Sequence, residues 1–298
     1  DYNSSGAQMF ESDDFDLDGA DITFTSGSGG VEFLDGGTGN IVLEEGADLT
    51  IDSGNGNITI QPKISGTATT TAEDVILDAG SGTISLDFAG VAINGDIGHI
   101  DLTAGTINFN GGLTSTGTAS DGSTTAEIDI NGAVVLEADS TFTTAGGNLD
   151  FSSSIASVST AKSLTITTTG GTVGVGGDIG ATNTTDLTTI SINTNATDTG
   201  AVTLSGNIGA SNVLGATTVA IGHANTGSIT LDGSAYSSDG AQDYKADAYA
   251  LGGTDPVFST TADNITFYDG GGATNFVLGN AADLTVNTNF TSTASAGN

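Results

Sequence analysis

The sequence predicts an all-β chain that winds into a parallel β-solenoid. Short apolar–polar–apolar triplets rich in Val, Ile and Thr recur along its whole length, as at Leu49–Ile51 and Ile190–Ile192, and this alternation is typical of half-buried strands. Gly, Asn, Asp and Ser separate the triplets, which indicates turns. Equivalent strands recur about every 25–29 residues, a spacing typical of stacked repeats.

The spacing can be followed coil by coil. The first apolar residues of the strands that set the period are Leu49, Val75, Ile100 and Ile128, and later Leu164, Ile190 and Val219. Each coil has an apolar face that only a neighbouring coil can bury, so stacking creates the core. Stacked strands lie ~4.8 Å apart, and roughly eleven coils would therefore make a rod about 50 Å long.

A corner motif punctuates the coils. Each unit is expected to contain a strand, a Gly-containing turn, a second strand and a corner of the form Gly-[Asp/Asn]-Ile-Gly, found at Gly95–Gly98, Gly177–Gly180 and Gly206–Gly209. We expect the three occurrences to be equivalent corners. Abundant Gly suits tight corners, and only two Pro suit interior strands that need every N–H.

Two other all-β architectures remain open. A β-sandwich array would join neighbouring strands by hairpins, and Asn-Gly pairs, which favour hairpin turns, occur at Asn94-Gly95, Asn110-Gly111 and Asn131-Gly132. A β-prism or an irregular solenoid is the other alternative. The regular period favours the β-solenoid.

We divide the chain into two parts. Residues 1–24 form an acidic N-terminal segment that either binds calcium or supplies a strand joining subunits. Residues 25–298 form one solenoid domain, in which an irregular insert near residues 234–256 breaks the period.

The N-terminal segment carries the sharpest local motif, Asp14-Phe15-Asp16-Leu17-Asp18-Gly19. It matches the first half of a calcium loop, whose alternate carboxylates converge on one cation. The predicted Ca²⁺ ligands are Asp14, Asp16, Asp18 and the carbonyl of Ala20. A Glu is expected at position twelve, where Thr25 stands. The alternative is an edge strand with its acids outward and Phe15 and Leu17 inward.

The insert supplies the other candidate site. Tyr236, Tyr244 and Tyr249 lie within it, and aromatic side chains on an outward loop would suit a ligand such as a glycan. We therefore predict that these tyrosines form a ligand-binding surface.

The charge balance excludes several classes of function. Three Lys and no Arg stand against 36 Asp and Glu, giving a net charge of −33, which excludes a phosphate-binding surface and hence nucleic acid as a partner. No apolar run is long enough to span a membrane as a helix. Catalysis on a glycosidic bond needs paired carboxylates, and the adjacent Asp13 and Asp14 are a formal candidate pair. We expect no enzyme.

Several runs resemble the repeats of filamentous-haemagglutinin-type adhesins. They are Gly146–Phe151 (Gly-Gly-Asn-Leu-Asp-Phe), Gly240–Tyr244 (Gly-Ala-Gln-Asp-Tyr) and Ala262–Phe267 (Ala-Asp-Asn-Ile-Thr-Phe), and the likeness covers most of residues 40–290. The resemblance implies a right-handed β-helical shaft, secretion to the cell surface, and a role in adhesion or biofilm. This chain is shorter and more acidic than those proteins.

Together these features predict an extracellular, non-enzymatic structural protein. Its coils have open strand edges at both ends, and such edges invite pairing, so we expect a homo-polymer that forms a cell-surface or biofilm-matrix fibre, with divalent cations offsetting the repulsion. The alternatives are a shaft fragment of an adhesin that binds glycan, matrix polysaccharide or another surface ligand, and a polysaccharide-degrading β-helix enzyme.

Overall fold

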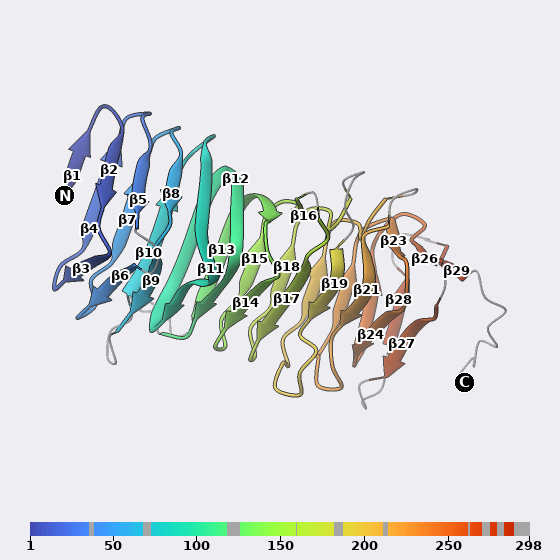
Figure 1. Cartoon of the computed structure of the whole chain (residues 1–298). Coiled ribbons are helices and arrows are strands. Elements are labelled where there is room, and N and C mark those ends of the chain that lie inside the picture. The colour runs from blue at the N-terminus through green and yellow to red at the C-terminus, as the bar shows by residue number, and fades with distance from the viewer. Residues whose placement is uncertain are drawn as a thin grey trace.

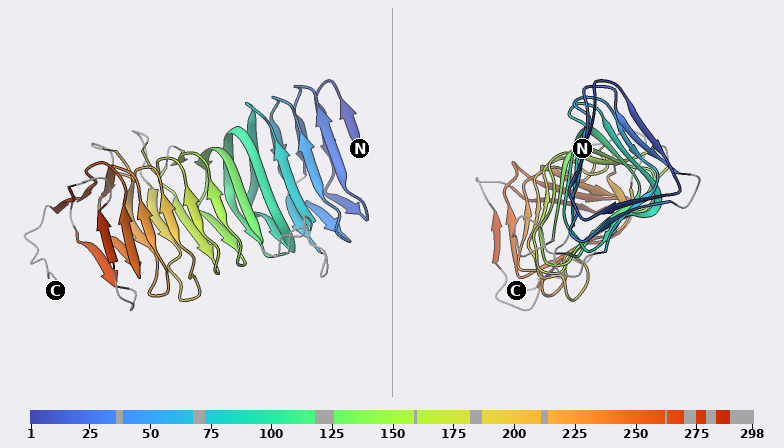
Figure 2. Two further views of the ribbon diagram at one scale, coloured as in Figure 1. Left: turned by 180° about the vertical axis from the view of Figure 1, so that it is seen from behind. Right: turned by 90° about the vertical axis from the view of Figure 1, so that its left-hand side faces the viewer.

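The chain is a parallel β-solenoid of about ten turns in the computed structural model, with no helix in the part described. The structure describes residues 1–35, 39–67, 73–117, 126–158, 160–181, 187–210, 214–261, 263–269, 275–278 and 283–288. Figure 1 shows the coils stacked into a rod with β1 and β29 at opposite ends, and Figure 2 shows the three-sided outline of the coils.

Each side of the rod is a stack of parallel strands. The first face holds β1 (Tyr2–Ser4), β4 (Ile22–Ser26), β7 (Leu49–Asp52), β10 (Glu73–Asp78), the first parts of β12 (Ile97–Ser115) and β13 (Glu127–Leu136), β15 (Leu149–Phe151), β18 (Val173–Val175), β20 (Val202–Leu204), β22 (Ile229–Leu231), β25 (Ala248–Leu251) and β28 (Asn275–Leu278).

The second face holds β2 (Gln8–Glu11), β5 (Val31–Leu34), β8 (Ile58–Ile60), the first part of β11 (Thr83–Gly95), the middle of β12, the second part of β13, β16 (Ile155–Ser157), single bridges at Ile179 and Ile208, β23 (Ala235–Ser238), β26 (Val257–Thr260) and β29 (Thr285–Thr288). The third face holds β3 (Asp14–Asp18), β6 (Asn40–Glu44), β9 (Lys63–Gly66), the ends of β11 and β12, β14 (Ser140–Thr144), β17 (Ser163–Thr168), β19 (Leu187–Ile192), β21 (Ala216–Ile221), β24 (Gln242–Ala246) and β27 (Ile265–Asp269).

The residues that set the period in the sequence stack directly on one another. Leu49, Val75, Ile100 and Ile128 pair in succession on the first face, and Leu164, Ile190 and Val219 do so on the third. The predicted β-solenoid is confirmed. Every strand pairing in the described ranges is parallel, which rules out a sandwich built from hairpins. A right-handed coil remains a prediction.

The core is a set of apolar ladders inside the tube. Alternate side chains of a strand point to opposite faces, so the first and third residues of triplets such as Leu49–Ile51 and Val202–Leu204 are buried while the central Thr is partly exposed. Burying such side chains on stacked neighbours is the main stabilising contribution, about 1.5–3 kcal/mol for each large one. Aromatic rings add to the ladders at both ends and near Phe142.

Acid and amide side chains join successive coils at the corners. Asp21 accepts the N–H of Asp48 at 3.3 Å, Asp48 accepts that of Asp74 at 2.8 Å, and Asp74 accepts that of His99 at 2.8 Å. The side-chain oxygens thus satisfy backbone N–H groups of the next coil. Many of the carboxylates therefore have a structural role.

The corner motif is only partly equivalent in its three occurrences. Ile179 pairs with Ile208, and Gly180 and Gly209 both have positive φ, 67° and 73°, so those two corners lie one above the other. Ile97 instead pairs with Glu73, ahead of the first face. The expectation of three equivalent corners is wrong, because a four-residue sequence fits more than one corner of the tube.

Two expected boundaries do not interrupt the coil. The residues of segment 1–24 form the first coil and the start of the second, and their strands pair in register with the coils that follow. Residues 234–256, expected to be an insert, contain β23, β24 and β25 in regular parallel ladders. The spacing looked irregular because the second face narrows to single bridges at Ile179 and Ile208 before β23 widens it again.

Candidate functional surfaces

The predicted calcium ligands lie on an edge strand of the first coil. Within β3, Asp14, Asp16 and Asp18 are exposed, whereas Leu17 is buried. Same-face residues of a strand are spaced ~6.8 Å apart, so the three carboxylates form a row rather than a convergent loop. The geometry is that of the alternative interpretation, an edge strand.

The rest of that motif adds no enclosed site. Gly19 turns the chain with a φ of 75°, and Ala20 is exposed beyond it. Within the part of the chain that the structure describes, no group of three or more His, Asp or Glu is arranged to hold a metal. Calcium binding by Asp14, Asp16, Asp18 and Ala20 stays a prediction.

The three candidate tyrosines point into the tube. Tyr236 and Tyr244 are 0% exposed and Tyr249 is 2% exposed. The prediction that they form an outward surface is wrong, because each occupies an inward position of its strand and packs on aliphatic residues of the preceding coil. A ligand outside the rod has no access to them.

Each tyrosine hydroxyl has a partner inside the tube. The Tyr236 hydroxyl accepts the N–H of Gly233 at 2.8 Å, and that of Tyr249 accepts the N–H of Ala246 at 2.9 Å. The Tyr244 hydroxyl donates to Oε1 of Gln242 at 3.0 Å. Burial raises the pKa of Tyr236 and of Tyr244 far above the usual value. These are structural groups.

A column of acids runs along the outer surface of the first face. Asp101, Asp129 and Asp150 pair in succession. His99 Nε2 lies 3.1 Å from Asp129 Oδ2, and the two form an ion pair when His99 is protonated. The hydrogen bond to Asp129 raises the pKa of His99, with burial opposing it. Burial, followed by the nearby Asp129 charge, raises the pKa of Asp150.

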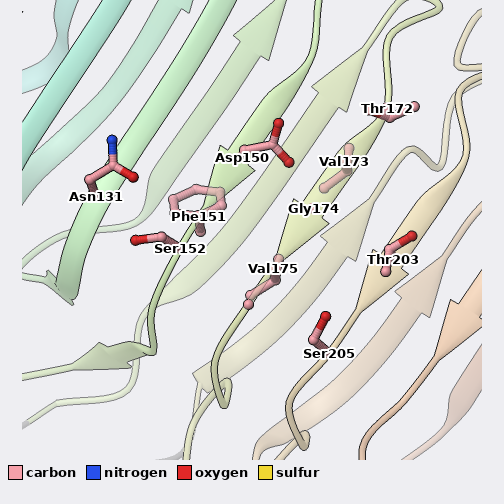
Figure 3. Close-up of a pocket in the computed structure, with 11 residues that line it drawn as sticks. Asn131, Asp150, Phe151, Ser152, Thr172, Val173, Gly174, Val175, Thr203 and Ser205 are labelled. Atoms are coloured by element: carbon pink, nitrogen blue, oxygen red, sulfur yellow. The ribbon is translucent and has the colours of Figure 1, made fainter. Parts of the chain in front are cut away.

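A shallow groove follows this column (Figure 3). Gly174 occupies the next outward position after Asp150, and the missing side chain leaves a groove of about 430 Å³. A Cβ at Gly174 would clash with the Asp150 carboxylate. The polar groups that line the groove come from Asn131, Asp150, Ser152, Thr172, Thr203 and Ser205. Such groups can hydrogen-bond a polar ligand, but Phe151 is buried and offers no stacking surface.

Exposed large apolar side chains gather at the two ends of the rod. On the first coil, Tyr2 is 54% exposed and Met9 is 65% exposed. On the last described strands the members are Tyr268, Phe276, Val277, Leu278 and Val286, each at least 41% exposed. Among the described residues, Ile76 is the one exposed large apolar residue that lies between the two ends. Sequence analysis missed this pattern because these residues follow the same alternation as the core.

Comparison with known proteins finds no matching family model, no matching curated protein and no matching solved structure. The β-solenoid structure supports the resemblance to filamentous-haemagglutinin-type repeats as far as a β-helical fold and no further. In the described part of the chain, no helix is long and apolar enough to cross a membrane.

Proposed function

We propose that this chain is a non-enzymatic structural element of a cell surface or biofilm matrix, a β-solenoid that self-assembles outside the cell into a fibre. One observation carries the proposal: the exposed large apolar side chains of the described residues lie at the two ends of the rod, apart from Ile76. Larger exposed apolar patches commonly mark interaction sites. The ends also carry strand edges open to further parallel pairing.

The sides of the rod favour separation. The chain has a net charge of −33, with three Lys and no Arg against 36 Asp and Glu. Side-by-side contact would bring acidic columns together, and like charges repel. Contact between ends buries apolar rings and presents the smallest charged area. Repulsion between the sides and apolar contact between the ends therefore both favour end-to-end assembly.

Cations are expected to control this growth. Asp14, Asp16 and Asp18 form an exposed row on the first coil, where an incoming molecule would add further carboxylates. Screening by salt shortens the range of repulsion to about 8 Å at physiological ionic strength. Calcium bound by this row would offset the charge directly, since it prefers carboxylate oxygens.

Electron microscopy and sedimentation of the purified chain test the proposal. We expect monomers at low ionic strength with a chelator, and linear assemblies when calcium or salt is added. A protein that stays monomeric at every concentration of salt and calcium would contradict the fibre function. Equal assembly in calcium and in chelator at matched ionic strength would show that calcium does not control assembly.

A second candidate is the shaft of an adhesin that binds glycan. The groove at Gly174 favours it, because its hydroxyl and carboxylate groups can bind sugar hydroxyls. Binding of oligosaccharides to the chain, lost in Thr203→Val with Ser205→Ala, would support this function. Release of free sugar during the assay would instead identify a polysaccharide-degrading enzyme.

A further inference from the structure

A two-coil aromatic unit occurs twice in the chain. Residues 2–33 align with residues 236–267 at a constant offset of 234 and without a gap, and eleven of the 32 positions are identical. The pairs that point inward are Tyr2 and Tyr236, Gln8 and Gln242, Phe10 and Tyr244, Phe15 and Tyr249, Leu17 and Leu251, Phe24 and Phe258, and Phe33 and Phe267. We name these ranges the first and second aromatic units.

The rings of the two units pack in the same way. Tyr2 stacks on Phe24 with centroids 4.9 Å apart, and Tyr236 stacks on Phe258 at 4.7 Å. The remaining matched contacts are Phe10–Phe24 (5.0 Å) with Tyr244–Phe258 (5.6 Å), Phe10–Phe33 (5.1 Å) with Tyr244–Phe267 (4.9 Å), Phe15–Phe33 (5.2 Å) with Tyr249–Phe267 (5.5 Å), and Phe24–Phe33 (5.1 Å) with Phe258–Phe267 (5.2 Å). The sequence repeat is therefore also a structural repeat.

A buried glutamine locks each unit in the same manner. Nε2 of Gln8 donates to the carbonyl of Tyr2 at 3.2 Å and to that of Thr25 at 2.7 Å. Nε2 of Gln242 donates to the equivalent carbonyls, those of Tyr236 at 3.0 Å and Ser259 at 2.7 Å. Each amide thus joins its own coil to the next.

The two units differ in what lies on their N-terminal side. The second unit stacks on an aliphatic coil, with Tyr236 on Ile208, Tyr244 on Ile221 and Tyr249 on Ile229. No described coil lies on that side of the first unit, where Tyr2 is 54% exposed and Phe10 and Phe15 are only partly buried. The second unit therefore shows what kind of surface covers this face: another solenoid coil with apolar inward residues.

We propose that the open face of the first coil, formed by β1, β2 and β3, docks the last coil of a second copy of this chain, formed by β27, β28 and β29. The inference rests on the proposed self-assembly and names its junction. The donor coil presents the inward residues Phe276, Leu278 and Val286, which are 41–46% exposed. Their burial on Tyr2, Phe10 and Phe15 gives the first unit an apolar coil of the kind that covers the second unit. The second unit is turned by one face of the tube, since Tyr2 lies on the first face and Tyr236 on the second.

The backbone of the first coil is oriented for this docking. Gln8 donates its N–H to Gly30 of the next coil at 3.0 Å, and successive N–H groups of a strand point to opposite sides. The N–H of Met9 and the carbonyl of Ala7 therefore face the open edge. The counterpart of Ala7 in the second unit is Ala241, whose carbonyl accepts the N–H of Val219 at 3.0 Å.

Substitutions at Met9 isolate this edge. The Met9 side chain is 65% exposed, so Met9→Ser replaces it with a short polar one and keeps the N–H. Met9→Pro removes the N–H as well and obstructs the edge, as proline does in edge strands. Sedimentation velocity over a range of concentrations, under conditions in which the wild-type chain assembles, measures the effect. We expect Met9→Pro to raise the concentration for half-assembly about tenfold or more, and Met9→Ser, which keeps the N–H, to raise it much less.

A second variant keeps the junction testable if Met9→Pro does not fold. Tyr2→Lys places a charge on the open face of the exposed first strand, and circular dichroism with thermal melting verifies that each variant is folded. If wild type forms filaments and a folded Met9→Pro or Tyr2→Lys forms them equally well, this junction is overturned while the fibre function stands. If wild type does not assemble under any condition, the fibre function itself falls.

Discussion

The first aromatic unit contains a buried polar atom that lacks a hydrogen-bond partner, whereas its counterpart in the second unit has one. Oε1 of Gln242 accepts the hydroxyl of Tyr244, whereas Oε1 of Gln8 is buried without a partner in the structure. The difference is the residue two positions on, because Phe10 stands where the second unit has a tyrosine. A buried carbonyl that lacks a partner costs about 1–3 kcal/mol.

Phe10→Tyr is therefore expected to stabilise the chain. The new hydroxyl donates to Gln8 as Tyr244 does to Gln242, with a gain of about 1 kcal/mol and a higher melting temperature. The matched control is Phe33→Tyr, at a buried ring next to Phe10 in the same ladder, which is expected to destabilise because its hydroxyl gains no such partner. A lower melting temperature for Phe10→Tyr would contradict the interpretation of the repeat.

Asp150 gives a prediction about pH. Its pKa is raised from the usual value chiefly by burial, so the folded chain holds this proton more tightly than the unfolded chain does. The favourable contribution is present below the unfolded pKa of about 3.9 and is lost as pH rises through the folded value. Asp150→Asn should therefore raise the melting temperature at pH 7 and change it little near pH 3.

The comparison for this prediction is Asp16→Asn, which removes the same charge from a strand position whose neighbour on the next coil is the uncharged Val42, whereas Asp150 has Asp129 beside it. It is expected to change the melting temperature less than Asp150→Asn does at pH 7. A destabilised Asp150→Asn variant at pH 7 would show that this carboxylate makes a favourable contact in its charged form.

At the scale of the element, the sequence predicts well where the strands lie and poorly which of their side chains point into the tube. The recurrence of Leu49, Val75, Ile100 and Ile128 predicts the coils correctly, because each marks the same inward position of successive strands. Tyr236, Tyr244 and Tyr249 were expected outside, because the second face shortens at Ile179 and Ile208 and obscures the period. Whether a residue lies inside depends on the register of its own coil, which spacing alone does not reveal.

The corner side chains are the elements that join the coils. Asn207 Oδ1 accepts the N–H groups of Ser234 and Ala235, each at 2.8 Å, and its own N–H donates to Asp178. Asn207→Ala leaves two backbone groups without these acceptors, and we expect a loss of about 1–3 kcal/mol.

Hydrogen exchange locates that loss. The amides of Ser234 and Ala235 should exchange faster in Asn207→Ala, whereas Thr141→Ala, at an exposed strand position, should leave them unchanged. Unaltered protection of both amides in Asn207→Ala would show that the corner bonds do not join the coils.

At the scale of the whole molecule, the charge governs both stability and association. A net charge of −33, with only three Lys against 36 Asp and Glu, means that the folded rod carries largely uncompensated repulsion. Raising ionic strength from 0.01 M to 0.1 M shortens the screening length from about 30 Å to about 10 Å. We therefore expect a higher melting temperature with added sodium chloride, measured at a concentration at which the chain remains monomeric.

Salt dependence also separates this account from one based on surface ion pairs. A rod stabilised by surface ion pairs would weaken as salt screens them, so a melting temperature that falls with sodium chloride would contradict the view of the acids as a repulsive coat. The outcome concerns the monomer and is independent of assembly.

Electron cryomicroscopy of assembled protein tests whether the rods extend one another end to end through their strand edges. The account predicts filaments one rod wide, in which a repeat of ~4.8 Å runs along the filament axis and continues through each junction of β27, β28 and β29 with β1, β2 and β3. Filaments in which rods lie side by side, with that repeat across the axis, would contradict it.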